Sequence, residues 1–280
     1  MQNNREIIEI IDGLKTSDGD GVQLTRIIGT AQLNMLDPFL LFDAFGSDKP
    51  QDYIGGFPSH PHRGFETVTY MLEGKMRHQD SVGNSGVIEK DGLQWMTAGK
   101  GIIHSEMPEQ EQGMLSGLQL WVNLPASKKM TSPKYQEKSA EQIPKEDRDN
   151  GTYLKVIAGE TTNGTKGVLE NSDVEAVYWD IHLPESENFK EHLPVTHNAF
   201  IYLIEGSIEI GESNQILNSG QLAVLSKGEV IEFHAKQKSR LLLIAGKPLN
   251  QPVARGGPFV MNTKAELHQA FADYQSGNLA

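Results

Sequence analysis

Short stretches in which apolar and polar residues alternate recur along the whole chain, and glycine-rich turns separate them. The segment GLQLWVNLP, at 117–125, puts its leucines and its valine on one face with a period of two, which is the pattern of a half-buried strand. FETVTYML, at 65–72, is rich in β-branched and aromatic residues and runs into a turn at Glu73-Gly74. Because helical periodicity is nearly absent, the pattern predicts an all-β protein built as a sandwich or barrel.

The second half of the chain repeats the first in outline. NAFIYLIEGSIEI, at 198–210, parallels FETVTYMLEGKM, and SGQLAVLSKGEVIEFHA parallels KDGLQWMTAGKGIIHSE. The copies are about 130 residues apart, which is far longer than a solenoid repeat. The stretch 126–151 between them is polar and charged and is typical of a connector. We therefore predict two β-barrels, at 1–130 and 151–280, joined by a linker at 131–150.

One segment, at the end of the chain, has strong helical periodicity. NTKAELHQAFADYQSG offers a capping box formed by Thr263 and Glu266. Apolar residues then follow at the helical spacing i, i+3, i+4 and i+7, namely Leu267, Ala270, Phe271 and Tyr274. We predict a C-terminal helix at about 263–276 whose apolar stripe packs against a barrel.

Composition narrows the class of protein. The chain has 280 residues, with 37 acidic and 25 basic side chains and a net charge of −12. Because this charge repels phosphate backbones, we expect no direct nucleic-acid partner. Cysteine is absent, which excludes disulfides, thiolate metal sites and cysteine nucleophiles. The first residues lack the apolar core of a signal peptide, and no apolar run reaches the roughly 18 residues that span a bilayer. We expect a cytoplasmic protein without membrane association.

Two histidine-bearing pairs are the strongest chemical signal. GGFPSHPHRGFE contains His60 and His62, and GKGIIHSEMP contains His104 and Glu106. In a strand, residues i and i+2 point to the same face, so each pair can present two side chains together. An isolated His-x-His pair is more often two packed or solvent-facing histidines. Here a His-x-His pair and a His-x-Glu pair are expected to meet inside a barrel, and the two together favour a metal site. Three imidazoles and one carboxylate suit a divalent first-row metal and leave coordination positions open for chemistry.

The first pair lies in a pattern that resembles the first motif of the cupin superfamily, G-x5-HxH-x3,4-E-x6-G. Here it reads Gly55-x4-His60-x-His62-x3-Glu66-x7-Gly74, one residue off at each end. The second cupin motif, G-x5-PxG-x2-H-x3-N, is matched less closely. We expect the glycines of both motifs to mark tight turns.

The departures in the second motif resemble the pirin family within the cupins. Gly99 stands where the motif has proline, and Pro108 stands where it has asparagine. LDPFLLFDAFG, GGFPSHPHRGFETVTYMLEG, LQWMTAGKGIIHSEMP, GLQLWVNLP and GPFVMNT are all similar to pirin segments. The resemblance implies a bicupin of two double-stranded jelly-roll barrels, in which the C-terminal barrel has no metal site.

The resemblance also implies the metal ligands, which fall on His60, His62, His104 and Glu106. One divalent metal per chain is expected, with Fe(II) as the metal of the family. The donor set suits Mn, Co, Ni, Cu or Zn as well. In pirins the general cupin glutamate is not a ligand, so Glu66 is expected to support the site or the fold.

The activity that the resemblance implies is that of a quercetin 2,3-dioxygenase, which opens the central ring of a flavonol with O2 and releases carbon monoxide. Glu106 would be both a ligand and the general base that takes the 3-hydroxyl proton. Six further residues are candidates for the pocket or its support, with core packing or surface exposure as the alternative: Phe57, Arg63, Glu66, Gln94, Met96 and Met107.

Two other functions stay open at this point. Eukaryotic pirins resemble non-enzymatic, iron-binding and redox-sensitive regulators that bind a protein partner. A cupin metal site can also serve an enzyme with an unrelated substrate, because one fold hosts many reactions. For the enzyme, the expected partners are a small aromatic substrate and O2, and a monomer is expected.

Overall fold

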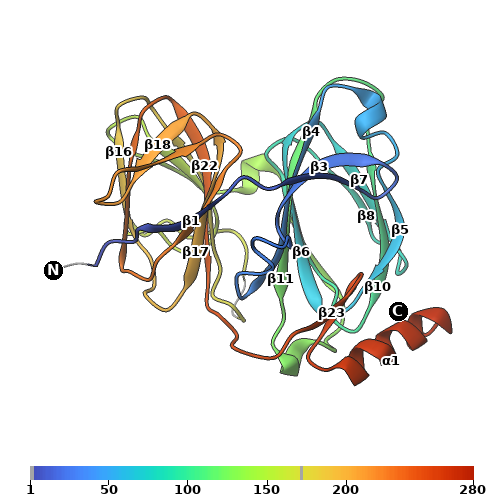
Figure 1. The fold of residues 1–280 in the computed structure, drawn as a ribbon. Helices are drawn as coiled ribbons and strands as arrows, with labels where there is room; N and C mark the ends of the chain where they lie inside the picture. Colours follow the sequence, from blue (N-terminus) through green and yellow to red (C-terminus); the bar gives the residue numbers. More distant parts are fainter. Residues whose placement is uncertain (1–2, 171–172) are drawn as a thin grey trace. The chain divides into compact units, whose positions relative to one another are not determined.

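A computed structural model describes residues 3–170 and 173–280 (Figure 1). Antiparallel strands dominate these residues, and α1 (Lys264–Gln275) is the α-helix among them. None of their helices is long and apolar enough to cross a membrane. Contacts divide the chain into a first barrel unit, Leu14–Ala140 with Leu249–Ala280, and a second barrel unit, Met1–Gly13 with Glu141–Pro248. The predicted all-β class with a C-terminal helix is confirmed.

The first barrel unit contains two main sheets. Seven strands lie in the order β12-β9-β6-β11-β4-β3-β2, and four lie in the order β5-β10-β7-β8. A small third sheet joins β23 (Ala254–Gly256) to β24 (Phe259–Met261). The bounds of the larger sheets are β2 (Leu14–Asp18), β3 (Val22–Ile28), β4 (Phe39–Ser47), β6 (Phe65–Glu73), β9 (Leu93–Thr97), β11 (Leu115–Asn123) and β12 (Lys134–Lys138), and β5 (Phe57–His62), β7 (Met76–Asp80), β8 (Ser85–Ile88) and β10 (Ile102–Pro108).

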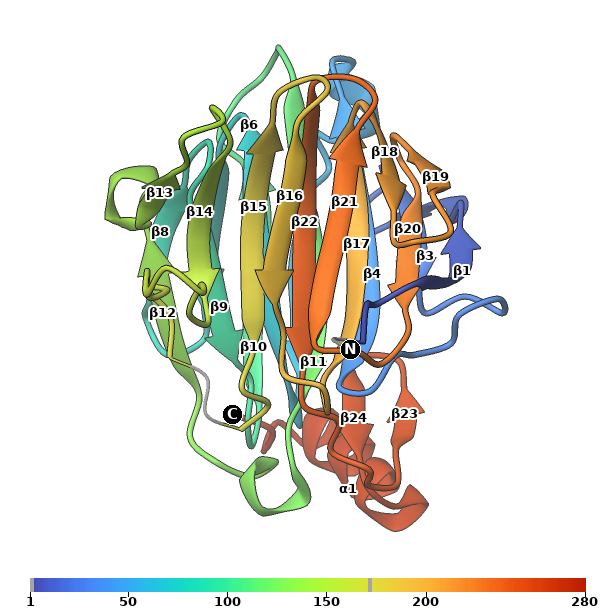
Figure 2. The ribbon, with the colours of Figure 1, turned by 90° about the vertical axis from the view of Figure 1, so that its left-hand side faces the viewer.

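The second barrel unit has the same construction. Its seven-stranded sheet runs β1-β20-β17-β22-β15-β14-β13, and the row from β14 to β20 is visible in Figure 2. Its four-stranded sheet runs β16-β21-β18-β19. The bounds are β1 (Ile7–Ile11), β13 (Lys145–Asp147), β14 (Tyr153–Ala158), β15 (Val177–Leu183), β17 (Asn198–Glu205), β20 (Leu222–Leu225) and β22 (Ser239–Gly246), and β16 (Asn188–His192), β18 (Ser207–Ile210), β19 (Gln215–Asn218) and β21 (Val230–Ala235).

The repeat predicted from the sequence corresponds to equivalent strands. FETVTYMLE is β6 and NAFIYLIE is β17, and each lies inside the seven-stranded sheet of its unit. The glycines that follow, Gly74 and Gly206, have φ angles of 82° and 89°. Only glycine adopts this backbone region without steric cost, so each tight turn after the repeated strand depends on its glycine.

The division between the units, at Ala140/Glu141, lies inside the predicted linker, but the units differ from the prediction in two respects. The first strand, β1, pairs with β20 of the second barrel unit, and the segment from Leu249 onward belongs to the first barrel unit. The predicted linker at 131–150 contains two paired strands, because β12 pairs with β9 and β13 pairs with β14. Charged residues are tolerated in β12 and β13 because both strands lie at a sheet edge.

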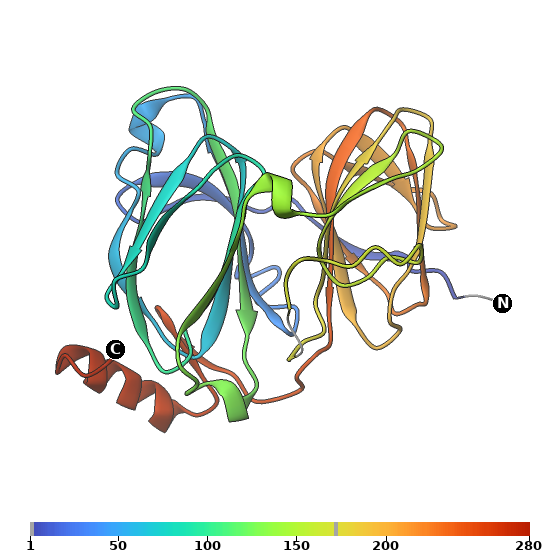
Figure 3. The same ribbon diagram turned by 180° about the vertical axis from the view of Figure 1, so that it is seen from behind.

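The C-terminal helix begins as predicted. Thr263 and Glu266 form the capping box, with the Thr263 amide donating to Glu266 Oε2 at 2.8 Å and the Glu266 amide donating to Thr263 Oγ1 at 3.2 Å. Leu267, Ala270 and Phe271 belong to one apolar cluster with Phe259. The helix therefore packs on the first barrel unit, at the lower end of that barrel in Figures 1 and 3.

The second barrel unit contains a buried ion pair on β15 and β22. Arg240 donates to both carboxylate oxygens of Asp180, at 3.1 and 2.8 Å, and Asp180 is fully buried. Burial alone would raise the pKa of Asp180, but His182 at 3.4 Å and the Arg240 guanidinium lower it. The carboxylate is therefore held in its ionised form.

Candidate metal centre

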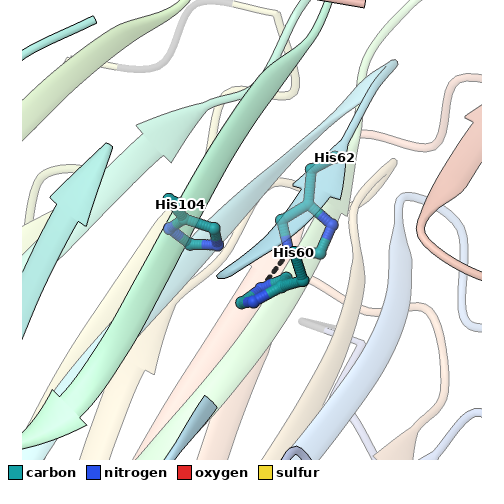
Figure 4. A group of neighbouring side chains, drawn as sticks. All are labelled: His60, His62 and His104. Atoms are coloured by element: carbon teal, nitrogen blue, oxygen red, sulfur yellow. Dashed lines mark hydrogen bonds between the residues drawn. The ribbon is translucent and has the colours of Figure 1, made fainter. Parts of the chain in front are cut away.

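Strands β5 and β10 bring three histidines of the first barrel unit together. The strands pair antiparallel with His60 opposite His104, and His62 follows His60 by two residues on the same face. One ring nitrogen from each of His60, His62 and His104 can be chosen so that all three lie within 4.8 Å of one another. Figure 4 shows the three rings turned toward a common point. The cluster can hold one metal ion, and the role of these residues as ligands stays a prediction.

Backbone carbonyls fix the orientation of two of the imidazoles. His60 Nδ1 lies 2.8 Å from the carbonyl oxygen of Pro58, and His62 Nδ1 lies 3.4 Å from that of Pro258. Carbonyls only accept, so each Nδ1 carries the proton and each Nε2 is left with a lone pair. This tautomer, with Nδ1–H bonded to a carbonyl, is the one that presents Nε2 to a metal.

The two Nε2 atoms then face each other at 3.0 Å, the contact drawn as a dashed line in Figure 4. Two lone pairs at this distance repel unless a proton or a cation lies between them. A proton is disfavoured, because burial and the neighbouring His104 and His60 hold the pKa of His62 well below its usual range. A metal cation resolves the conflict, so the arrangement fits one.

His104 supplies a further reason to expect a metal ion at the cluster. Both of its ring nitrogens are buried, and neither has a hydrogen-bond partner among the described residues. Burial, with smaller contributions from His60 and His78, lowers the pKa of His104 to about 3, so the ring is neutral. An unsatisfied buried polar atom costs about 1–3 kcal/mol. A metal ion at the cluster would satisfy one of these nitrogens.

Glu106 lies on the same strand, two residues after His104, but outside the group of three histidines. The pairing of β10 with β5 shifts register between these two residues, so Glu106 is opposite Phe57. Its buried carboxylate accepts a hydrogen bond of 2.9 Å from Thr69 Oγ1 and lines the same cavity as His60. Its predicted roles as fourth ligand and general base stay predictions.

Thr69 links Glu106 to Gln119. Thr69 Oγ1 is 2.9 Å from Glu106 Oε1 and 2.6 Å from the Gln119 side-chain oxygen as placed. A hydroxyl has one proton, and an ionised carboxylate can only accept. The oxygen and nitrogen of a side-chain amide are assigned from the hydrogen bonds around them. Here those bonds require the Gln119 NH2 group to donate to Thr69 Oγ1. Thr69 then donates to Glu106 and fixes one carboxylate oxygen.

His60 and His62 line a cavity of about 510 Å³ within the first barrel unit. A volume of this size suits a small organic ligand. One wall is apolar and belongs to the core cluster of the barrel, through Leu24, Phe45, Phe57 and Met76. The polar and aromatic remainder includes Thr69, Glu106, Gln119, Trp121, Arg26, Asp43, Asp18 and Arg255.

Of the six residues predicted for the pocket or its support, Phe57 lines the cavity wall. The other five do not line it. Arg63 instead forms an ion pair of 2.6 Å with Asp273 and also donates to the Lys100 carbonyl. Its long side chain therefore anchors helix α1 to the strand that carries the histidines.

The remaining four residues have structural contacts. Glu66 accepts from Thr97 Oγ1 at 2.6 Å, and Gln94 donates to Glu137 at 3.1 Å. Met96 lies in the apolar cluster with Ala98 and Ile102, and the Met107 sulfur lies against Gly56.

At the equivalent strand pair the second barrel unit buries two phenylalanines and the carboxylate of Glu191. β16 and β21 hold the sheet positions that β5 and β10 hold in the first unit. Phe189 and Phe233 stack there, with ring centroids 4.8 Å apart, inside the main apolar cluster. Within residues 141–170 and 173–248, no group of three His, Asp or Glu side chains is arranged to hold a metal.

Several cavity residues were not predicted from the sequence. Thr69 and Gln119 are polar residues within apolar strands, and this signal could have been noticed. Arg255 and Pro258 gave no such signal, because they lie in the short strand β23 and the turn after it, far along the chain from the histidine pairs. Only the return of the C-terminal segment to the first barrel unit brings them to the site.

Comparison with known proteins agrees with this architecture. The family model Pirin matches residues 21–122, and the Pirin C-terminal cupin domain matches residues 178–280. A pirin-like protein from Caulobacter vibrioides is 50% identical over 273 residues, which cover 98% of either chain. A Pseudomonas aeruginosa protein, whose name gives quercetin 2,3-dioxygenase as a provisional assignment, is 45% identical over 100% of either chain.

Among solved structures, the quercetin 2,3-dioxygenase from Acinetobacter baumannii matches with a TM-score of 0.91 and 34% identity. The match covers 99% of this chain and 98% of that one. The predicted arrangement of two cupin-type barrels is thereby confirmed. Together with the family models over both barrels, these similarities show that the chain belongs to the pirin family.

Proposed function

We propose that the protein is a metal-dependent dioxygenase of the quercetinase type. It would bind a flavonol, or a related enol or phenol, with O2 at His60, His62, His104 and Glu106. One divalent ion would be held there, with Fe(II) as the proposed metal. The names of two relatives, the P. aeruginosa protein and the A. baumannii enzyme, support the activity.

The observation that carries the proposal is the convergence of three imidazoles, two of them buried, beside an organic-sized cavity that His60 and His62 line. A structural metal site has all its coordination positions filled by the protein. Three histidines and one carboxylate leave one or two positions open in a five- or six-coordinate shell. Open positions next to a cavity support a catalytic role over a structural one.

A bound divalent ion would supply Lewis-acid stabilisation of negative charge on a substrate oxygen. Glu106 would take the proton from the flavonol 3-hydroxyl, and it lines the cavity into which that hydroxyl would enter. Thr69 holds one oxygen of this carboxylate, which leaves the other free to face the substrate or the metal. Phe45, Phe57 and Trp121 would pack on the aromatic rings and exclude water.

The test is turnover of quercetin by metal-loaded, full-length protein under air. Loss of the flavonol absorbance with release of carbon monoxide is expected, and both should require O2. Glu106→Gln keeps the shape of the side chain but cannot act as a base. We expect it to lower turnover by at least about 100-fold.

The control is the metal content of each preparation. His62→Ala and His104→Ala should lose both metal and activity while the barrel stays folded by circular dichroism. Wild-type protein that carries stoichiometric Fe(II) but consumes neither quercetin nor O2 would refute the proposal. That result would favour the non-enzymatic regulator considered above.

A further inference from the structure

Three of the charged side chains in the cavity wall form a closed ion-pair network. Arg26 donates to both carboxylate oxygens of Asp43, at 2.9 and 2.7 Å, and also to Asp18 at 2.8 Å. Asp43 is buried, and its bidentate bond with Arg26 is a strong, geometrically fixed one. These three groups satisfy one another and leave little capacity to recognise a ligand charge.

Arg255 differs from them. Its Nη1 donates to the Leu40 carbonyl at 2.8 Å, and its guanidinium lies 5.1 Å from the centre of the Trp121 ring. None of the ion pairs among residues 3–170 and 173–280 includes it. A guanidinium has five N–H donors, and among the described residues Arg255 donates one hydrogen bond, to the Leu40 carbonyl, while it lines the cavity and stays exposed.

Trp121 connects Arg255 to the histidine cluster. The Trp121 ring centre is 5.3 Å from that of His62, in an edge-on contact. The distance from the Arg255 guanidinium to the centre of the His62 ring therefore cannot exceed the sum of these two distances, 5.1 Å from Arg255 to Trp121 and 5.3 Å from Trp121 to His62. A two- or three-ring aromatic molecule bound at the metal can span that interval.

Neighbouring contacts fix the segment that carries Arg255. The Pro258 carbonyl faces His62 Nδ1 at 3.4 Å, and the Val260 amide donates to the Arg63 carbonyl at 3.0 Å. Lys129 donates to the carbonyl of Val260 at 2.9 Å. A guanidinium held by a fixed backbone loses less entropy when it binds a ligand.

We propose that Arg255 selects substrates that carry an anionic group, such as a carboxylate, at the end remote from the metal-binding oxygen. The inference rests on the proposed function, because it assigns the substrate class of the same site. The favoured ligands are planar hydroxyaromatic or enol acids, and neutral flavonols bind less tightly.

The test compares two probes, 4′-carboxy-3-hydroxyflavone and its neutral 4′-carboxamide, on Zn(II)-loaded full-length protein. Binding is read from quenching of Trp121 fluorescence, because Trp95 and Trp179 are buried away from the cavity wall. We expect the carboxylate to bind about tenfold more tightly, as one charge-assisted hydrogen bond at a partly exposed site provides. Arg255→Gln should abolish this preference, and Arg255→Lys should keep part of it.

Arg77→Gln is the matched control. Arg77 is an exposed arginine of the first barrel unit that pairs with Glu109 and does not line the cavity. Its variant removes the same charge and should keep the tenfold preference. Equal binding of the two probes by wild type, no binding of either, or a preference that survives in Arg255→Gln would each overturn the inference.

The experiment separates this inference from the proposed function. Binding to Zn(II)-loaded protein does not depend on turnover, so the preference for the carboxylate can appear even if no flavonol is oxidised. Conversely, equal affinity and equal turnover of both probes would leave the dioxygenase proposal intact and remove the role assigned to Arg255.

Discussion

Replacement of Thr69 by valine tests whether Glu106 is a metal ligand that depends on its neighbours. Valine keeps the branched shape of threonine but lacks the hydroxyl that donates to Glu106 Oε1 at 2.9 Å. Thr69 and Glu106 are both buried, and a valine side chain has no group that can donate to the carboxylate. The Glu106 carboxylate would then be free to turn away from the position in which it can reach the metal.

Two independent estimates give the size of the effect. A hydrogen bond to a charged group contributes about 1.5–3 kcal/mol. Removal of a residue that orients a metal ligand typically lowers metal affinity by about 10–100-fold, which corresponds to about 1.4–2.7 kcal/mol. We therefore expect Thr69→Val to raise the Zn(II) dissociation constant by about 10–100-fold, while Thr69→Ser, which keeps the hydroxyl, stays close to wild type.

The assay is a competition titration of metal-free protein against a chromophoric chelator. The visible absorption of the Co(II)-loaded protein gives a second readout, because its intensity depends on the number of ligands. Thr67→Val is the matched control: Thr67 is also buried on β6 but does not line the cavity, so its variant should bind metal normally. Unchanged affinity in Thr69→Val, or an equal loss in both variants, would refute the reasoning.

Three further outcomes are expected. Metal-free His104→Leu should unfold at a higher temperature than metal-free wild type, because it removes two buried nitrogens that lack partners among the described residues. Added Zn(II) should raise the unfolding temperature of the wild type alone in thermal scans. Gly64→Ala should lower the free energy of unfolding in denaturant by about 3 kcal/mol or more, because at φ 88° the added Cβ would overlap the Val260 carbonyl. Gly83→Ala, at φ 95° with no atom within 4 Å of the added Cβ, should lower it by about 1 kcal/mol. The pKa of Asp180 is lowered in the folded state, so its carboxylate stabilises the fold above the unfolded pKa of about 3.9. As pH falls below about 4, the unfolding free energy of wild type should drop more steeply than that of Asp180→Asn, and parallel curves would contradict this.

Short-range pattern was sufficient for the strands, for the repeat and for the two histidine-bearing pairs. The β-branched and aromatic composition of β6, the alternation within β11, the repeated turn glycines and the spacing of His60 and His62 are all local features. The capping box of α1 is equally local. Each of these predictions needed only the fixed geometry of one strand, turn or helix end.

The unit boundaries required information that no local pattern carries. An apolar strand such as β1 can complete either barrel, and its own residues do not say which sheet edge it joins. The same holds for the segment that supplies Pro258 to His62, since the two residues are separated by 196 positions in the chain. Contacts at such separations depend on the whole fold, so the cavity wall they form could not be predicted.

The proposed ligands are held in two different ways, and this difference has a chemical consequence. Proline carbonyls orient His60 and His62, so their geometry is a property of the backbone and survives most side-chain substitutions. The carboxylate of Glu106 is oriented by the Thr69 side chain and, behind it, by Gln119. Substitutions at those two positions can change the basicity and reach of Glu106 without moving the imidazoles. With the histidine framework held by the backbone, the hydroxyl and the amide are therefore the positions at which the chemistry of this site can be tuned.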